Sequence, residues 1–242
     1  MGKLRFFLSA LVLSLPAYAG NVILNSGFET NGGSGSSTFA GWPVVNESGS
    51  GGSWYVQTGS TSPTSGLPVS LPTEGNFAAM TDSSSPGSQV LIQDFTIPVG
   101  AGPVFLSFDY FLNNLGPDYV PGSDLDFNNS PNQQARVDIL SAAAGAFDTT
   151  VLLNVFQTQS GDPLQPGAYQ TLTANITSAV GAGGTFQLRF AEVDSLQTLN
   201  FGIDNVQIDT GVPEPSAIAL AAMGLLLLAW CVGRKRGATR NG

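Results

Sequence analysis

The side chains that could carry chemistry in this sequence are almost all carboxylates. The chain of 242 residues has 17 Asp and Glu, no His and one Cys, which is Cys231. The lack of His excludes a Ser–His–Asp triad, an imidazole general base and a His-ligated zinc. The single Cys excludes an internal disulfide and a four-cysteine metal site.

The remaining catalytic chemistry is that of two carboxylates about 5–10 Å apart, which hydrolyse glycosides without His. The acids that could pair across neighbouring strands are Asp109, Asp138, Glu192 and Asp194. Such pairs are expected by chance in a chain with so many acids. The sequence therefore predicts a protein that is not an enzyme, with a carboxylate-only glycosidase or lyase as the alternative.

The charges are distributed very unevenly. Between Gly20 and Ser216 there are two arginines and all 17 acidic residues, a net charge of about −15, and no Lys. Schiff-base chemistry and P-loop phosphate binding both need a lysine, so both are excluded from this segment. A body without a basic patch is not expected to bind nucleic acid. Its negative surface suits divalent cations and an extracellular setting.

Residues 1–19 are typical of a secretory signal peptide. Lys3 and Arg5 form a positive start, Phe6 to Leu15 is mostly apolar, and Ala17-Tyr18-Ala19 fits the small-x-small cleavage rule. We therefore expect the mature chain to begin at Gly20.

The C-terminal tail, residues 212–236, has three parts in a fixed order. They are Val212-Pro213-Glu214-Pro215, the uncharged run 217–233, and the basic triplet Arg234-Lys235-Arg236. Seventeen helical residues at ~1.5 Å each span about 26 Å, slightly less than a ~30 Å hydrocarbon core. The run predicts a single transmembrane helix, and the basic triplet predicts that its far end stays in the cytoplasm. These features alone do not separate a permanent anchor from a processed one.

This order of motif, apolar helix and basic triplet resembles the PEP-CTERM sorting tail of Gram-negative bacteria. The resemblance implies a partner, an exosortase-type membrane enzyme that cuts near the Pro-Glu-Pro motif. It also implies export, a transient stay in the inner membrane, and a final place at the cell surface or outside the cell.

Residues 20–211 show the pattern of an all-β domain. Short alternating runs are separated by Gly, Pro, Asn and Ser clusters, and no helix-length 3.6-residue period precedes Pro213. We expect an antiparallel β-sandwich of the jelly-roll type. The expected strands are 21–24, 53–57, 77–81, 89–97, 104–111, 135–140, 151–156, 169–174, 185–192 and 199–208.

A shift of parity occurs near the end of the domain. Leu199, Phe201 and Ile203 share one parity, whereas Val206 and Ile208 share the other. The shift predicts a β-bulge at Asp204–Asn205.

Two motifs at the ends of this domain resemble the galactose-binding-like jelly rolls of carbohydrate-binding modules. They are Asn25-Ser26-Gly27-Phe28-Glu29 and Gly202-Ile203-Asp204-Asn205-Val206. The resemblance implies that the two motifs lie side by side and that Glu29 and Asp204 serve a structural calcium. The alternative is that Glu29 is a solvated turn acid and that Asp204 caps backbone amides.

Other residues give weaker indications of ligands. The segment from Asp124 to Asn128 imitates an EF-hand loop but lacks its Gly and its final Glu, so that motif is rejected, and only a loose cation site with Asp118 stays open. The aromatic side chains near the polar insertions are expected in the core or as loop anchors rather than as sugar platforms: Trp42, Trp54, Tyr55 and Tyr119.

The function expected from these features is that of a secreted, non-catalytic surface or matrix protein. Its β-sandwich would associate with exopolysaccharide in a biofilm. The alternatives are the carboxylate-only enzyme and a purely structural, calcium-stabilised surface protein.

Overall fold

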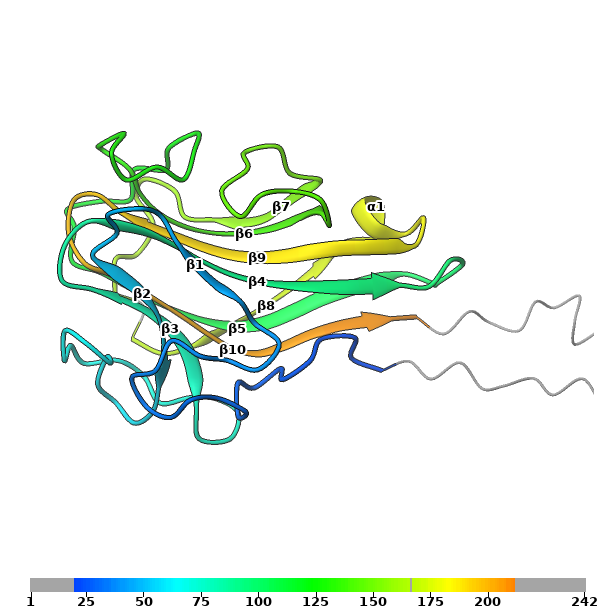
Figure 1. The fold of residues 1–242 in the computed structure, drawn as a ribbon, viewed down its shortest axis with the longest axis horizontal. Coiled ribbons are helices and arrows are strands. Elements are labelled where there is room, and N and C mark those ends of the chain that lie inside the picture. Colours follow the sequence, from blue (N-terminus) through cyan, green and yellow to red (C-terminus); the bar gives the residue numbers. More distant parts are fainter. Residues whose placement is uncertain (1–19, 166, 212–242) are drawn as a thin grey trace, which may run out of the picture. The chain divides into compact units, whose positions relative to one another are not determined.

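Two five-stranded antiparallel sheets face each other in the computed structural model, which describes residues 20–165 and 167–211 (Figure 1). The strand orders are β1-β4-β9-β6-β7 and β2-β3-β10-β5-β8. The elements are β1 (Val44–Asn46), β2 (Gly52–Gln57), β3 (Ala78–Ser83), β4 (Gly87–Ile97), β5 (Val104–Asn114), β6 (Gln133–Ser141), β7 (Leu153–Gln157), β8 (Gln170–Asn175), α1 (Thr177–Val180), β9 (Gly184–Asp194) and β10 (Leu199–Thr210).

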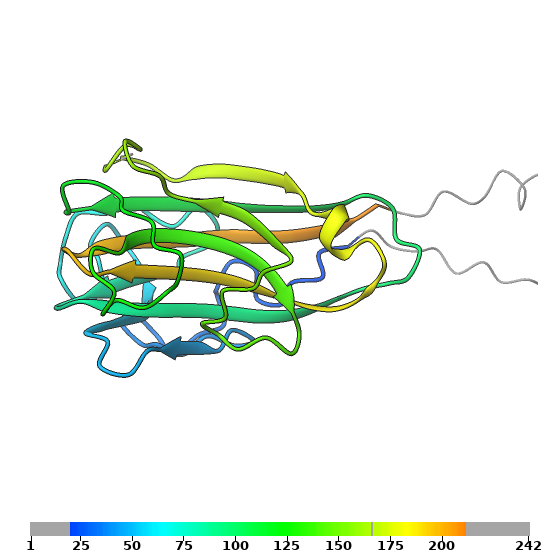
Figure 2. The same ribbon diagram turned by 90° about the horizontal axis from the view of Figure 1, so that it is seen from above.

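The strand order is that of a jelly roll. From β3 to β10, each strand is followed by one in the opposite sheet, except that β6 and β7 are neighbours in the same sheet. A long hairpin folded over on itself gives this order. Figure 2 shows the long strands running along a common direction. The predicted antiparallel jelly-roll sandwich is confirmed.

The main core lies between the sheets, where apolar residues of one parity gather along the long strands. Leu188 and Phe190 of β9 are fully buried, as are Phe108 of β5 and Phe201 of β10. The Phe190 ring lies 5.4 Å from the Phe108 ring and 6.4 Å from the Phe201 ring, centroid to centroid. Burial of each such side chain contributes about 1.5–3 kcal/mol relative to exposure.

The expected strands from Ser53 onward all form, but the expected strand 21–24 does not. Only Asn21 makes a bridge, to Asp209, and the rest of that segment runs as irregular chain along β10. The Asn21 side chain explains this, because it accepts from the Ile208 N–H and donates to the Val206 carbonyl in place of a backbone ladder. The short strand β1 and the single turn α1 were not predicted, since three or four residues are too few for a periodic signal.

Three of the sequence predictions lie outside the described residues. They are the signal peptide 1–19, the transmembrane run 217–233, and the sorting and basic motifs 212–215 and 234–236. In the part of the chain that the structure describes, no helix has the length and apolar character to cross a membrane.

Candidate functional site

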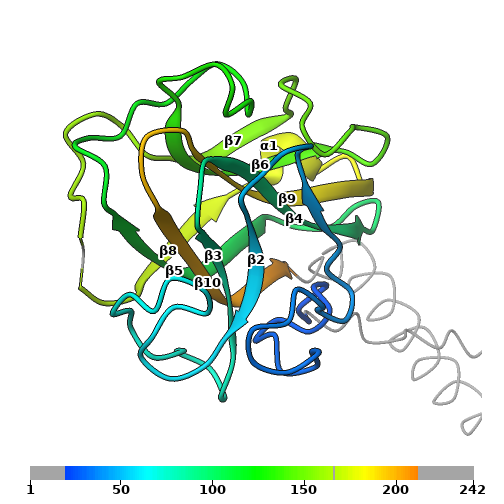
Figure 3. The same ribbon diagram turned by 60° about the vertical axis from the view of Figure 1, so that its left-hand side comes forward.

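The two predicted calcium residues hold the same short segment, residues 73–77, in the connection between β2 and β3. This connection lies below β2 in Figure 3 (cyan). Asp204 Oδ2 accepts from the backbone N–H groups of Thr73 at 2.7 Å and Glu74 at 2.8 Å. Glu29 Oε1 accepts from the N–H groups of Asn76 at 2.8 Å and Phe77 at 2.9 Å. The opening and closing motifs of the domain therefore meet at one segment, as their resemblance implied.

The predicted β-bulge places Asp204. The β5–β10 register shifts between Asp204 and Gln207, and Asn205 has a φ of 50°. The bulge is therefore confirmed. Asp204 is fully buried, and this loss of hydration raises its pKa to about 6 although four backbone or hydroxyl donors favour its charged form.

Both oxygens of Asp204 already have donors, which is the amide-capping role that was the alternative to calcium for this residue. Glu29, expected under that alternative to be a solvated turn acid, instead caps two amides through Oε1. Ca²⁺ takes six to eight oxygen ligands. Within residues 20–165 and 167–211, no group of three or more His, Cys, Asp or Glu side chains is placed to hold a metal ion. The donors around Asp204 do not fit a calcium ligand set, and calcium at Glu29 and Asp204 stays a prediction.

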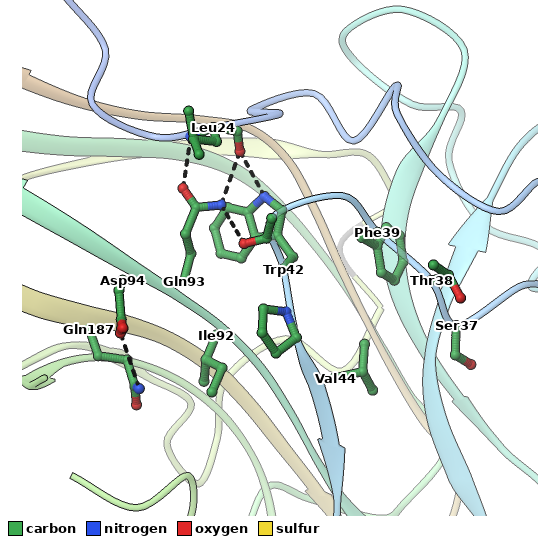
Figure 4. Close-up of a pocket in the computed structure, with 12 residues that line it drawn as sticks. Leu24, Ser37, Thr38, Phe39, Trp42, Val44, Ile92, Gln93, Asp94 and Gln187 are labelled. Carbon is green, nitrogen blue, oxygen red and sulfur yellow. Dashed lines mark hydrogen bonds between the residues drawn. The ribbon is translucent and has the colours of Figure 1, made fainter. Parts of the chain in front are cut away.

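A groove of about 610 Å³ lies beside β1 and β4 (Figure 4). Its floor is positioned by Gln93, whose Oε1 accepts from the Leu24 N–H at 2.7 Å. The Nε2 of Gln93 donates to the carbonyls of Leu24 and Gly41, both at 3.0 Å. Trp42 also donates to the Leu24 carbonyl, so the N-terminal segment is fastened along the groove.

The lining of this groove mixes apolar and polar groups. Figure 4 shows Asp94 and Gln187 on one side and Ser37 and Thr38 on the other. Asp94, Ser37 and Thr38 are exposed, whereas Gln187 is only 6% exposed. Gln187 Nε2 donates to Asp94 Oδ1 at 3.4 Å, and its Oε1 is buried without a partner among the described residues.

The sequence reasoning missed this groove, although it contained a signal for it. Gln93 shares the parity of Leu91 and Phe95 on β4 and so interrupts an apolar face. A polar side chain on a core-facing parity must find partners, because an unpaired buried amide costs free energy. Those partners, at Leu24 and Gly41, are distant in sequence.

Of the four carboxylates considered for catalysis, Asp109 and Asp138 are fully engaged. Arg136 and Arg189 bind Asp138, with closest N–O distances of 2.7 and 2.6 Å. Asp109 accepts from Thr73, Thr171 and Asn205. Neither is free to act as an acid or base.

The other two, Glu192 and Asp194, lie together between the sheets and are 1% and 2% exposed. Burial raises the pKa of Glu192 well above its usual value and the pKa of Asp194 to about 7.

The predicted aromatic positions are mostly in the core. Trp42, Trp54 and Tyr119 are buried, and Tyr55 is half-buried. In the 118–134 insertion, Asp124 and Asp126 accept hydrogen bonds from their own loop. Asp118 accepts instead from Ser160 and Gly161. Asp118 and Asp124 thus have different hydrogen-bond partners, and these contacts do not join them in the loose cation site considered from the sequence.

Comparison with solved structures finds β-sandwich domains of low sequence identity. TmCBM61 in complex with beta-1,4-galactotriose is 14% identical at a TM-score of 0.45, over 78% of this chain and 97% of that one. The K3 cleaved adhesin domain of Lys-gingipain from Porphyromonas gingivalis is 12% identical at a TM-score of 0.44, over 81% and 98%. A cyclase from Fischerella sp. TAU is 19% identical at a TM-score of 0.47, over 81% and 98%. At these values, what those proteins bind is no guide to what this chain binds.

The C-terminal tail gives the sharper comparison. No curated protein matches the chain. Residues 211–235, however, match the PEP-CTERM protein-sorting motif, in agreement with the order of motif, apolar run and basic triplet in the sequence. This motif indicates secretion with transient membrane anchoring and processing by an exosortase system. The chain thus carries a PEP-CTERM protein-sorting motif behind an all-β jelly-roll sandwich.

Proposed function

We propose that this chain is a non-catalytic surface or matrix protein whose groove beside β1 and β4 holds polysaccharide. The observation that carries the proposal is the lining of that groove. The exposed side chains of Asp94, Ser37 and Thr38 offer acceptors and donors for sugar hydroxyls. Pro43 and Ile92 offer apolar surface between them. Ligand sites commonly combine apolar surface with a few converging polar groups.

The negative charge of the β-sandwich domain indicates whether the expected polysaccharide is charged or neutral. The domain carries far more carboxylates than arginines, and Asp94 places one of these carboxylates in the groove itself. An anionic polysaccharide would be repelled by such a surface. We therefore expect a neutral exopolysaccharide of a biofilm matrix as the ligand, with the exosortase system delivering the protein to the same place.

The arrangement of carboxylates supports a binding role rather than hydrolysis. Glycosidases place two carboxyl groups about 5–10 Å apart around the scissile bond. The groove contributes one carboxylate, Asp94. Incubation of the full chain with a bound polysaccharide should release no reducing ends above the background. Release of sugar by the wild-type chain would favour the carboxylate-only glycosidase.

A glycan array probed with the purified full chain tests the binding role. We expect binding to neutral glycans, and the Asp94→Ala variant should bind at least about tenfold more weakly, as for the loss of one charge-assisted hydrogen bond. Asp209→Asn is a matched control, because Asp209 is an exposed acid outside the groove. Equal binding by Asp94→Ala and wild type would contradict the groove, and an array without any binding would favour the purely structural coat protein.

A further inference from the structure

Glu192 and Asp194 lie two residues apart on β9 and point into the space between the sheets. They share the parity of Leu188 and Phe190, which are core residues. Neither oxygen of Glu192 has a hydrogen-bond partner within the described part of the chain, and nor does Oδ1 of Asp194. The Oδ2 of Asp194 accepts from the Ser83 hydroxyl of β3, in the opposite sheet. Both oxygens of Glu192 are therefore buried and unpaired beside the buried carboxylate of Asp194, whose charged form the backbone N–H groups of Gly87 and Leu199 also favour.

No basic side chain of the domain balances these carboxylates. Residues 20–211 contain two basic side chains, Arg136 and Arg189, and both bind Asp138. Strand alternation puts both arginines on the outer face of this sheet, opposite to the inner face that carries Glu192. A buried carboxylate without a counter-charge is strongly unfavourable.

A second, uncharged side chain points to a missing ligand at the same place. Gln89 of β4 is the register partner of Glu192 and lies on the same inner face. It is fully buried, and both its Oε1 and its Nε2 lack partners among the described residues. Its amide lies beside Gly87, where an added Cβ would come within 2.3 Å of Nε2, and Gly87 is the register partner of Asp194. The Gln89 side chain therefore extends from the position opposite Glu192 toward the position opposite Asp194.

An entrance reaches Asp194, one of these residues, from the end of the sandwich. A cavity of about 280 Å³ is lined by Ser83 to Pro86 on one side and by Asp194 with Leu196 to Thr198 on the other. Ser83 and Asp194 are therefore shared by the cavity and the cluster. The cavity is large enough to admit an ion with its water molecules.

We propose that this buried set of oxygens binds a calcium ion between the two sheets. The set consists of Glu192, Asp194, Gln89 and Ser83. The ligands are all hard oxygens, with no imidazole or thiol, which favours Ca²⁺ over a transition metal. Two carboxylates, an amide oxygen and a hydroxyl supply four or five ligands, and water from the cavity completes the six to eight that Ca²⁺ takes. This site is distinct from Glu29 and Asp204.

Calorimetric titration of the chelator-treated full chain with Ca²⁺ tests this site. We expect Glu192→Gln, which keeps the shape and removes the charge, to lose one bound ion per chain or at least about tenfold in affinity. Glu29→Gln is the matched control, because it alters the other predicted calcium residue and leaves this cluster intact. A wild-type chain that binds no calcium, or calcium binding abolished by Glu29→Gln and unchanged by Glu192→Gln, would overturn the proposal.

A second variant keeps the test decisive if Glu192→Gln does not fold. Gln89→Leu removes an amide that has no partner without the ion, so its melting temperature in EDTA should equal or exceed that of the wild type. Its calcium affinity should nevertheless fall several-fold, because one ligand is lost. Wild-type affinity in Gln89→Leu would count against the assigned ligands.

Discussion

At the scale of single residues, Asn205 shows how one side chain sets the geometry of the closing strand. Its backbone is in the left-handed region, with φ at 50°, where Asn and Gly are tolerated and other residues are strained. Its side chain donates to Asp109 and accepts from Gln207. The bulge that directs Asp204 toward the 73–77 segment therefore depends on Asn205.

Replacement of Asn205 separates the backbone effect from the hydrogen bonds. Asn205→Ala should lower the free energy of unfolding by about 2 kcal/mol, from left-handed strain and lost hydrogen bonds together. Asn205→Gly should lose only about half of this, since Gly accepts positive φ. Denaturant unfolding of the two variants measures the difference. Equal destabilisation would show that the backbone conformation contributes little.

At the scale of elements, the segment before β1 is held by side chains rather than by a strand ladder. Gln93 of β4 makes three hydrogen bonds to Leu24 and Gly41, and Trp42 packs its ring against Phe190 at 5.8 Å. One glutamine thus joins the N-terminal segment to the first sheet and shapes one side of the groove.

Removal of this amide should unfasten the segment. Gln93→Ala leaves the Leu24 N–H and the Gly41 carbonyl without their partner, whereas the Leu24 carbonyl keeps the Trp42 donor. The loss should cost about 2 kcal/mol in the free energy of unfolding. Thr96→Ala on the same strand is a suitable control, because its hydroxyl makes one exposed hydrogen bond. Hydrogen exchange at Leu24 should rise in Gln93→Ala alone, and protection as in the wild type would show that other contacts hold the segment.

At the scale of the whole molecule, the start and end of the described domain lie side by side. The Val22 N–H donates to the Ile208 carbonyl, and Gly211 exchanges backbone hydrogen bonds with Gly102 and Pro103. The sorting motif at 211–235 begins at this last residue.

Substitution within the tail tests delivery independently of ligand binding. The double variant Pro213→Ala with Glu214→Ala should keep its C-terminal residues and stay in the inner-membrane fraction, whereas the wild type should be shortened and reach the surface. Thr239→Ala, beyond the matched motif, is the control. Mass spectrometry of the C-terminus measures the processing. Normal shortening of the double variant would mean that the Pro-Glu-Pro motif is not needed.

Local patterns in the sequence were sufficient for the sorting motif, the all-β class and the bulge at Asp204–Asn205. Each of these predictions depends only on the order or parity of neighbouring residues, and this local order is the same in the unfolded chain.

Only the tertiary structure placed the groove and the buried acids. Gln93 acquires its role from Leu24 and Gly41, and Glu192 is opposite Gln89 only because β4 and β9, about a hundred residues apart in the chain, pair in one register. Contacts between residues so far apart in the sequence form only when the jelly-roll topology pairs their strands. The sequence predicted carboxylates able to bind or react, and the fold decided which were paired with arginines and which were left between the sheets.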